Sequence, residues 1–105
     1  MYFLMICPHH QGPQIAALRD ALRPQHRAWV ASGGAGLAKV LTGSALWDDA
    51  GQGMGNFGIL EAADEAAARA FAQGDPFAQG GVIARVDLTR LADSFQASRI
   101  SPMTS

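Results

Sequence analysis

Charged residues are scarce in this sequence. They make up 16% of its 105 residues, whereas a globular domain normally carries about a quarter. The eight Lys and Arg nearly balance the nine Asp and Glu, for a formal net charge of −1, so nothing favours nucleic acid or an anionic membrane surface as a partner. The shortage of charge indicates either a surface rich in small uncharged residues or burial of part of that surface against a second copy.

Cysteine is almost absent as well. Cys7 alone cannot form an internal disulfide, and although His9 and His10 follow it closely, no second cluster exists to complete a zinc site. We therefore expect neither a metal nor another cofactor. The apolar opening run is too short for a membrane span or a signal sequence and lacks a basic start, so a cytosolic location is expected.

The first half of the chain predicts one strand followed by helix. Residues 2–7 are apolar at every position, as in a strand whose two faces are both covered. A helical stripe of apolar residues begins at Gln14, and Pro24 is expected to end one helix near Leu22 and to start another. Gly33 and Gly34 are expected to stop the second helix.

The second half predicts three more strands and one more helix. Strands are expected over 37–47, with a bend at Gly43 and Ser44, and over 56–62, joined by a glycine-rich loop that is either a flexible lid or a plain connection. Asp64 is a good N-cap for an alanine-rich helix that ends at Gly74. Alternation predicts a fourth strand over 81–88, which completes a domain over 1–91. A polar tail, 92–105, follows, with a short helical turn near 91–95.

In order, these elements predict a β-α-β-β-α-β chain, the ferredoxin-like α+β fold, with a four-stranded antiparallel sheet and two helices on one face. Two helices cover only one side of such a sheet. Because the other side also carries apolar residues, we expect a second copy of the chain, packed sheet to sheet, to cover it. The expected partner is therefore the chain itself, as a homodimer.

His26 occupies a position where packing alone would call for an apolar residue. It shares a helical stripe with Leu22, Trp29 and Val30, so its ring needs a polar partner. A histidine close after Pro24 would also lie near the positive start of a helix, which keeps imidazole neutral and able to accept a proton. The alternative is a buried histidine that hydrogen-bonds to backbone and has no chemical role.

Asp75 and Arg23 are two further candidates. Asp75 follows a predicted helix C-terminus, where negative charge is unfavourable, so either a compensating donor or cation is expected or the residue forms an ordinary Asx-turn. Arg23 lies three residues before His26 and can clamp a carboxylate or phenolate, unless it simply pairs with Asp20 on the helix surface. Each candidate thus has a structural explanation as well as a chemical one.

Several short segments, in this order, resemble the YCII-related (YciI-like) proteins over nearly the whole stretch 2–88. They are 23–26 (Arg-Pro-Gln-His), 48–52 (Asp-Asp-Ala-Gly-Gln), the helix 65–72, 75–77 (Asp-Pro-Phe) and 80–82 (Gly-Gly-Val). The resemblance implies a ferredoxin-like monomer that pairs as a dimeric α+β barrel. It also implies a pocket with a dyad of His26 and Asp75 as its active site, with Arg23 matching an arginine one turn before the histidine.

Two positions depart from the family's pattern. Asn56 stands where many relatives have a serine entering the third strand, and Ser44 begins the segment where they have Gly-Pro-Leu. Asn56 still donates and accepts hydrogen bonds, although a hydroxyl role is lost. Together with Arg23, these two residues are expected to bind the substrate.

Two functions fit these expectations. One is a cofactor-independent lyase or isomerase acting on an anionic or hydroxylated small molecule, with His26 as general base or acid and Asp75 fixing its tautomer. The other is a non-catalytic ligand-binding or accessory dimer in which the dyad is structural. A dyad at the floor of an open pocket would favour the enzyme, and a sealed dyad would favour the structural role.

Overall fold

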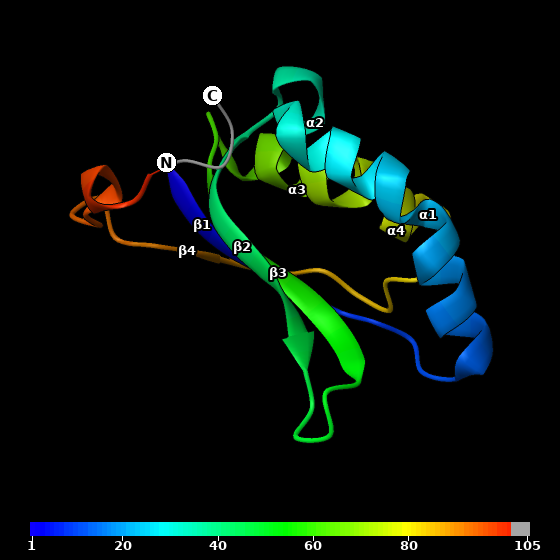
Figure 1. Cartoon of the computed structure of the whole chain (residues 1–105). Coiled ribbons are helices and arrows are strands. Elements are labelled where there is room, and N and C mark those ends of the chain that lie inside the picture. Colours follow the sequence, from blue (N-terminus) through cyan, green and yellow to red (C-terminus); the bar gives the residue numbers. More distant parts are fainter. Residues whose placement is uncertain (102–105) are drawn as a thin grey trace.

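The chain folds into an antiparallel sheet with its α-helices on one face (Figure 1). The computed structural model describes residues 1–101. Its strands are β1 (Tyr2–Pro8), β2 (Lys39–Trp47), β3 (Gly53–Glu61) and β4 (Asp87–Arg90), in the order β2-β3-β1-β4. Its helices are α1 (Pro13–Ala31), α2 (Gly33–Gly36), α3 (Glu65–Gly74), α4 (Pro76–Gln79) and the 3-10 helix η1 (Ala97–Arg99). The ferredoxin-like α+β fold predicted from the sequence is confirmed.

Alternate residues of β1 point into the core and to the outer face of the sheet. Phe3, Met5 and Cys7 are buried on the side of the helices, whereas Leu4 is half-buried and Ile6 is 36% exposed. Strand residues alternate between faces, so within one chain the outer face of β1 is only partly covered, whereas the sequence predicts cover on both faces. The core on the helix side also contains Val40, Leu60, Ala68, Phe71 and Ala72.

The helix break predicted at Pro24 is wrong, because α1 is one helix of 19 residues that runs through it. Proline has no amide hydrogen, so the carbonyl of Asp20 loses its usual helical partner. Pro24 is exposed, and water can satisfy that carbonyl. His26 consequently lies well inside a helix, whereas the sequence predicts a position near a helix start.

The glycines after α1 end it as predicted. Gly33 and Gly34 adopt left-handed backbone angles, with φ of 60° and 64°. A Cβ on Gly34 would also lie 2.8 Å from ring atoms of both Trp29 and Phe71. The chain therefore needs glycine here for its backbone angle and for the close approach of two aromatic rings.

The hairpin of β2 and β3 differs from the prediction in three details. β2 begins at Lys39, and its register shifts fall between Val40 and Thr42 and between Leu46 and Trp47, so no bend occurs at Gly43 and Ser44. A single extra residue such as Leu41 is a β-bulge, which sequence alternation does not reveal.

The loop between the two strands is also shorter than predicted, because β3 already starts at Gly53. The carboxylate of Asp48 accepts hydrogen bonds from the amides of Ala50 and Gln52, both at 2.9 Å. These bonds favour a plain connection over a flexible lid.

The fourth strand lies later than predicted, at Asp87–Arg90 instead of 81–88. The earlier part still follows β1: His10 N donates to Val82 O at 2.9 Å, and Ala84 N donates to Pro8 O at 2.8 Å. A regular ladder cannot continue there because Pro8 has no amide hydrogen to donate. The alternating residues thus predict that a fourth strand forms but not its boundaries.

A single hydrogen-bonded turn forms within the predicted stretch 91–95, where the amide of Phe95 donates to the carbonyl of Ala92 at 2.9 Å, and a 3-10 helix follows only later, as η1. Phe95 packs on Tyr2 of β1, with ring centroids 5.5 Å apart. The last four residues of the predicted tail, 102–105, lie outside the described residues.

Candidate active site

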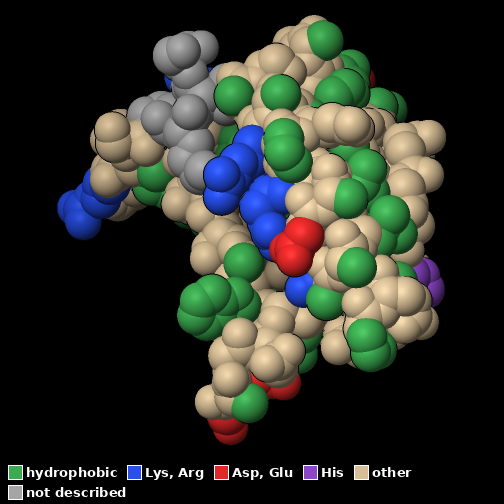
Figure 2. Space-filling model, turned by 45° about the vertical axis from the view of Figure 1, so that its right-hand side comes forward, with side chains coloured by type: hydrophobic (Ala, Val, Ile, Leu, Met, Phe, Trp, Pro, Cys, Tyr) green, Lys and Arg blue, Asp and Glu red, His purple; other side chains and the backbone are tan. Residues whose placement is uncertain are grey.

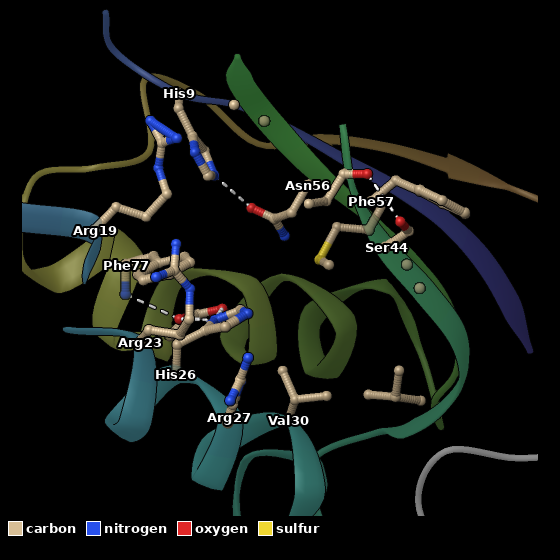
Figure 3. Close-up of a pocket in the computed structure, with 18 of the residues that line it drawn as sticks. His9, Arg19, Arg23, His26, Arg27, Val30, Ser44, Asn56, Phe57 and Phe77 are labelled. Carbon is tan, nitrogen blue, oxygen red and sulfur yellow. Dashed lines mark hydrogen bonds and ion pairs between the residues drawn. The ribbon is translucent and has the colours of Figure 1, made fainter. Parts of the chain in front are cut away.

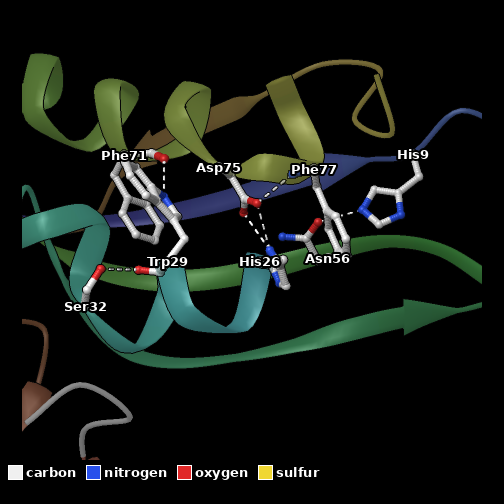
Figure 4. A network of polar contacts seen from close by, with 8 residues as sticks. All are labelled: His9, His26, Trp29, Ser32, Asn56, Phe71, Asp75 and Phe77. Atoms are coloured by element: carbon white, nitrogen blue, oxygen red, sulfur yellow. Dashed lines mark hydrogen bonds and ion pairs between the residues drawn. The ribbon is translucent and has the colours of Figure 1, made fainter. Parts of the chain in front are cut away.

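His26 of α1 and Asp75 form a close hydrogen-bonded pair (Figure 4). Nδ1 of His26 lies 2.8 Å from each carboxylate oxygen of Asp75. A carboxylate only accepts hydrogen bonds, so Nδ1 carries the hydrogen and Nε2 is left as the proton acceptor of the neutral ring. The His26 side chain is 18% exposed, whereas Asp75 is 3% exposed. The arrangement is a buried carboxylate behind an imidazole that reaches solvent.

Asp75 is held at the junction of two helices. It follows Gly74, the last residue of α3, and it is the N-cap of α4. Its Oδ1 accepts a hydrogen bond from the amide of Phe77 at 2.9 Å. The side chain therefore forms the capping turn and contacts His26 at once, so the two explanations offered by the sequence are both realised.

Phe77 lies against both histidines of the site. Its ring stacks on His26, with centroids 4.0 Å apart and planes at 4°, and it meets His9 edge-on at 5.7 Å and 81°. Phe77 is itself buried. The aromatic ring therefore packs against both imidazoles, and their ring nitrogens remain available for polar partners.

An open cavity of about 620 Å³ lies between α1 and the sheet, next to the dyad (Figure 3). Its polar lining includes His9, Arg19, Arg23, His26, Arg27, Ser44, Asn56 and Asp75. Asp75 is the only acidic residue that lines this cavity in the described part of the chain, against three arginines. In Figure 2, Lys and Arg side chains gather in a hollow on this side of the molecule. The cavity is therefore suited to an anionic ligand.

The three arginines follow one another at four-residue intervals along α1, and so share one helix face. Arg23 makes an exposed ion pair with Asp20 at 2.6 Å, as the surface alternative expects, and lines the cavity as well. Among residues 1–101, no acidic partner lies within ion-pair distance of Arg19 or Arg27. The guanidinium of Arg19 packs against Gly53, where a Cβ would collide with it.

Ser44 is not brought to the dyad. Ser44 pairs with Phe57 across the hairpin, whereas Asn56 pairs with the next residue, Ala45. The hydroxyl of Ser44 donates to the carbonyl of Ala45 at 2.8 Å. Neighbouring strand residues face opposite sides of a sheet, so Ser44 and Asn56 point to different faces. The three predicted substrate-binding residues, Arg23, Ser44 and Asn56, all line the cavity.

His9 is a residue of the site that sequence reasoning missed. It is 5% exposed, and its Nε2 lies 2.7 Å from Oδ1 of Asn56. Burial lowers the pKa of His9 below its ordinary value, and the positive charge of Arg19 adds to this effect although the Asn56 bond opposes it. The sequence offers only a histidine next to an apolar strand, in a segment that lacks the further ligands of a zinc site.

Cys7 takes no part in this chemistry. The side chain is 1% exposed, and burial raises the pKa of its thiol to about 12, with smaller contributions from the charges of Asp75 and Asp87. A thiol with such a pKa is not a nucleophile near neutral pH. Within the described residues, no three His, Cys, Asp or Glu side chains gather as a metal site, and no helix is long and apolar enough to cross a membrane.

Comparison with solved structures shows the same fold in two bacterial proteins. One is 5-chloro-2-hydroxyhydroquinone dehydrochlorinase (TftG) from Burkholderia phenoliruptrix AC1100, in complex with 2,5-dihydroxybenzoquinone. It is 24% identical, with a TM-score of 0.72, over 88% of this chain and 94% of that one. The other is Rv0793 from Mycobacterium tuberculosis, which is 15% identical, with a TM-score of 0.54, over 91% of this chain and all of that one.

Comparison with curated proteins finds no match to this sequence. The model of the YCII-related domain matches residues 1–92, which is most of the chain and includes every residue of the site described above. The chain therefore belongs to the YCII-related domain family.

Proposed function

We propose that this protein is a cofactor-independent enzyme that transfers a proton on a small molecule through His26 and Asp75. The observation that carries this proposal is the placement of the dyad: the carboxylate is buried, and the imidazole lines an open cavity. A purely structural pair would have no need of a cavity at its imidazole. General acid–base catalysis needs a proton acceptor that substrate can reach and a partner that stabilises the imidazolium.

In the proposed reaction, Nε2 of His26 removes a proton from an acidic C–H or O–H of the substrate. The electron pair left behind moves toward a neighbouring carbonyl or ring, and the carboxylate of Asp75 stabilises the imidazolium through Nδ1. The proton then returns to a different atom in an isomerisation, or goes to a leaving group in an elimination. Acid–base catalysis of this kind contributes roughly 10²–10⁴-fold to a rate.

The proposed substrate is anionic or hydroxylated. Arg19, Arg23 and Arg27 line the cavity, and the first and last have no acidic partner among residues 1–101. A carboxylate or phenolate would neutralise the positive charge of these arginines. Arg23 and Asn56 would orient this substrate, with Ser44 also lining the cavity. The solved dehydrochlorinase holds a dihydroxybenzoquinone, so hydroxylated rings are the first compounds to test.

The test is turnover by wild-type protein and two variants, on a panel of hydroxylated aromatic and carboxylated compounds. We expect His26→Ala to abolish turnover and Asp75→Asn to lower it by roughly a hundredfold or more. The matched controls are Gln25→Ala, on the same helix, and Asp64→Asn, the N-cap of α3. Unchanged turnover in His26→Ala would refute the proposal. Binding without turnover of any compound would favour a ligand-binding role.

The protein is further proposed to act as a homodimer through the outer face of the sheet. Ile6 pairs with Phe57 and Leu4 with Ile59, so these four apolar residues share that face. Ile6 is 36% exposed, and the other three are half-buried in a single chain. A sheet-to-sheet dimer would bury them. Sedimentation should show a dimer that Ile6→Asp dissociates, and a wild-type monomer at micromolar concentration would refute the dimer.

A further inference from the structure

We infer that His9 and Asn56 form a second functional pair, in which His9 fixes the Asn56 amide so that its N–H₂ group faces the cavity opposite His26. The inference rests on the proposed role of His26 as proton acceptor and adds the substrate class. The substrate would carry an oxygen that gains negative charge when His26 removes a proton, as in an enolate or a phenolate. Asn56 would be the donor that receives this charge, and His9 a positioning residue.

The position of His9 makes it a rigid support. It follows β1, where its amide donates to Met54 O at 2.9 Å, and it pairs with Ile83 as an isolated bridge. Its ring meets Phe77 edge-on at 5.7 Å. The main chain of His9 is thus fixed by two backbone contacts, and its ring is fixed by Phe77, independently of the contact with Asn56.

The tautomer of His9 follows from its two ring nitrogens. Nδ1 is buried and has no hydrogen-bond partner among the described residues. The cationic side chain of Arg19 lies beside the ring (Figure 3), and a cation favours a lone pair over an N–H on the nitrogen that faces it. Burial lowers the pKa of His9, so the ring stays neutral and holds one hydrogen. That hydrogen is on Nε2, which donates to Oδ1 of Asn56 at 2.7 Å.

This bond determines which end of the Asn56 amide faces the cavity. With Oδ1 engaged by His9, the amide nitrogen turns toward the side of His26 (Figure 4). The reverse orientation would set the N–H₂ group against the N–H of His9, two donors in contact. The cavity is therefore given two hydrogen-bond donors and no acceptor at this position.

Donors suit an oxygen that becomes negative during reaction. A fixed donor stabilises an oxyanion without having to reorganise, and loss of one such donor commonly lowers a rate by about 10²–10³-fold. His26 on one wall and Asn56 on the other can act on a carbonyl compound or a hydroxylated ring together, one taking the proton and one binding the oxygen. A substrate that develops positive charge would gain nothing from this amide.

The first test needs no ligand. Long-range ¹H–¹⁵N NMR of the wild-type protein should show His9 as the neutral tautomer with hydrogen on Nε2 at neutral pH. A neutral ring with its hydrogen on Nδ1 would overturn the inference, because Nε2 would then accept from the Asn56 amide nitrogen and Asn56 would present its oxygen to the cavity. His26 can keep its proposed role whichever result is obtained, so this failure is distinct from failure of the proposed function.

The second test uses 4-nitrophenol as the probe, since its phenolate absorbs visible light and the neutral phenol does not. Wild-type protein should bind the phenolate, and Asn56→Leu should weaken its binding about tenfold or more by removing the donor without adding charge. His9→Phe should weaken it similarly, and the double variant should be no weaker than Asn56→Leu, because His9 acts only through Asn56. His10→Phe, at the exposed neighbour of His9, is the matched control and should bind as wild type does.

Other results have defined meanings. Additive losses in the double variant would give His9 a role independent of Asn56 and overturn the positioning role. Equal phenolate binding by wild type and Asn56→Leu, or no binding by wild type, would overturn the oxygen assignment. If His9→Phe fails to fold, the NMR measurement and Asn56→Leu still decide the outcome. If Asn56→Leu lost phenolate binding while His26→Ala kept its turnover, Asn56 would keep its assignment as the donor to the oxygen, and the proposed enzyme mechanism would be rejected.

Discussion

The imidazole of His26 lies flat on the ring of Phe77, with planes only 4° apart, while the backbone amide of the same phenylalanine donates to Asp75. Phe77 thus contacts the face of the histidine with its side chain and the carboxylate with its main chain. Orientation of the dyad depends on this one residue, which reaches both of its members. Its removal should affect stability and chemistry together.

Phe77→Ala should destabilise the protein by about 3–5 kcal/mol, the usual cost of removing a buried phenylalanine side chain. Phe77→Leu should cost less, because it refills part of the space, yet it leaves His26 without a stacking partner. We therefore expect Phe77→Leu to lower turnover more than its modest loss of stability explains. Urea unfolding and turnover measured together check this, and equal activity of wild type and Phe77→Leu would contradict it.

Gly34→Ala should be much more damaging than Gly36→Ala. Both glycines have positive φ, of 64° and 91°, but only a Cβ at Gly34 would meet Trp29 and Phe71, whereas Gly36 has open space. We expect a cost of about 1 kcal/mol at Gly36, from backbone strain alone. At Gly34 we expect at least about 2 kcal/mol more, because two packed rings must shift. Equal melting temperatures for the two variants would show that the aromatic contact is unimportant.

Pro24→Ala should stabilise the protein. Alanine restores the amide hydrogen that the carbonyl of Asp20 lacks in α1 and is better suited to a helix interior, by as much as about 3 kcal/mol in model helices. The gain in the protein should be smaller, since proline also restricts the unfolded chain. Guanidinium unfolding measures the difference, with Gln25→Ala as the control on the same helix. A decrease in stability would mean that Pro24 makes a contribution we have not identified.

The pKa of His9 predicts a pH dependence of stability. Burial lowers it below the ordinary value of 6.5, so the unfolded chain binds a proton at a pH where the folded chain does not. Stability should therefore fall as the pH drops below about 6.5, until the lowered pKa of the folded state is reached. His9→Gln removes the titrating group and should lose less stability than wild type over this window. A steeper loss in His9→Gln would contradict the neutral, buried state of His9.

The elements of the fold follow from patterns that depend on near neighbours, whereas the pairing of His26 with Asp75 is what the resemblance to the YCII-related proteins implies. Apolar runs and alternation predict the strands, and the spacing of Leu22, His26 and Trp29 predicts the helix face. The capping role of Asp64 is confirmed, with Oδ1 accepting from the amide of Ala67 at 2.8 Å. His26 and Asp75 do lie together in the structure, although their catalytic role remains a proposal.

The features that sequence reasoning missed depend on solvent or on distant partners. Pro24 is tolerated because it faces water, and the exposure of one helical residue cannot be read locally. The bulge after Val40 and the position of β4 depend on how strands match across the sheet. His9 appears unremarkable until the fold brings β3 alongside, because its partner Asn56 lies 47 positions away along the chain.

The double use of the Asp75 carboxylate joins local folding to assembly of the site. Oδ1 of the carboxylate accepts from the amide of Phe77 in the first turn of α4, and the carbonyl of the same residue accepts from the amides of Ala78 and Gln79. The start of this four-residue helix and the orientation of His26 therefore depend on the same residue. A ligand entering the cavity meets a dyad that is already aligned, so its affinity is not reduced by any need to organise this pair.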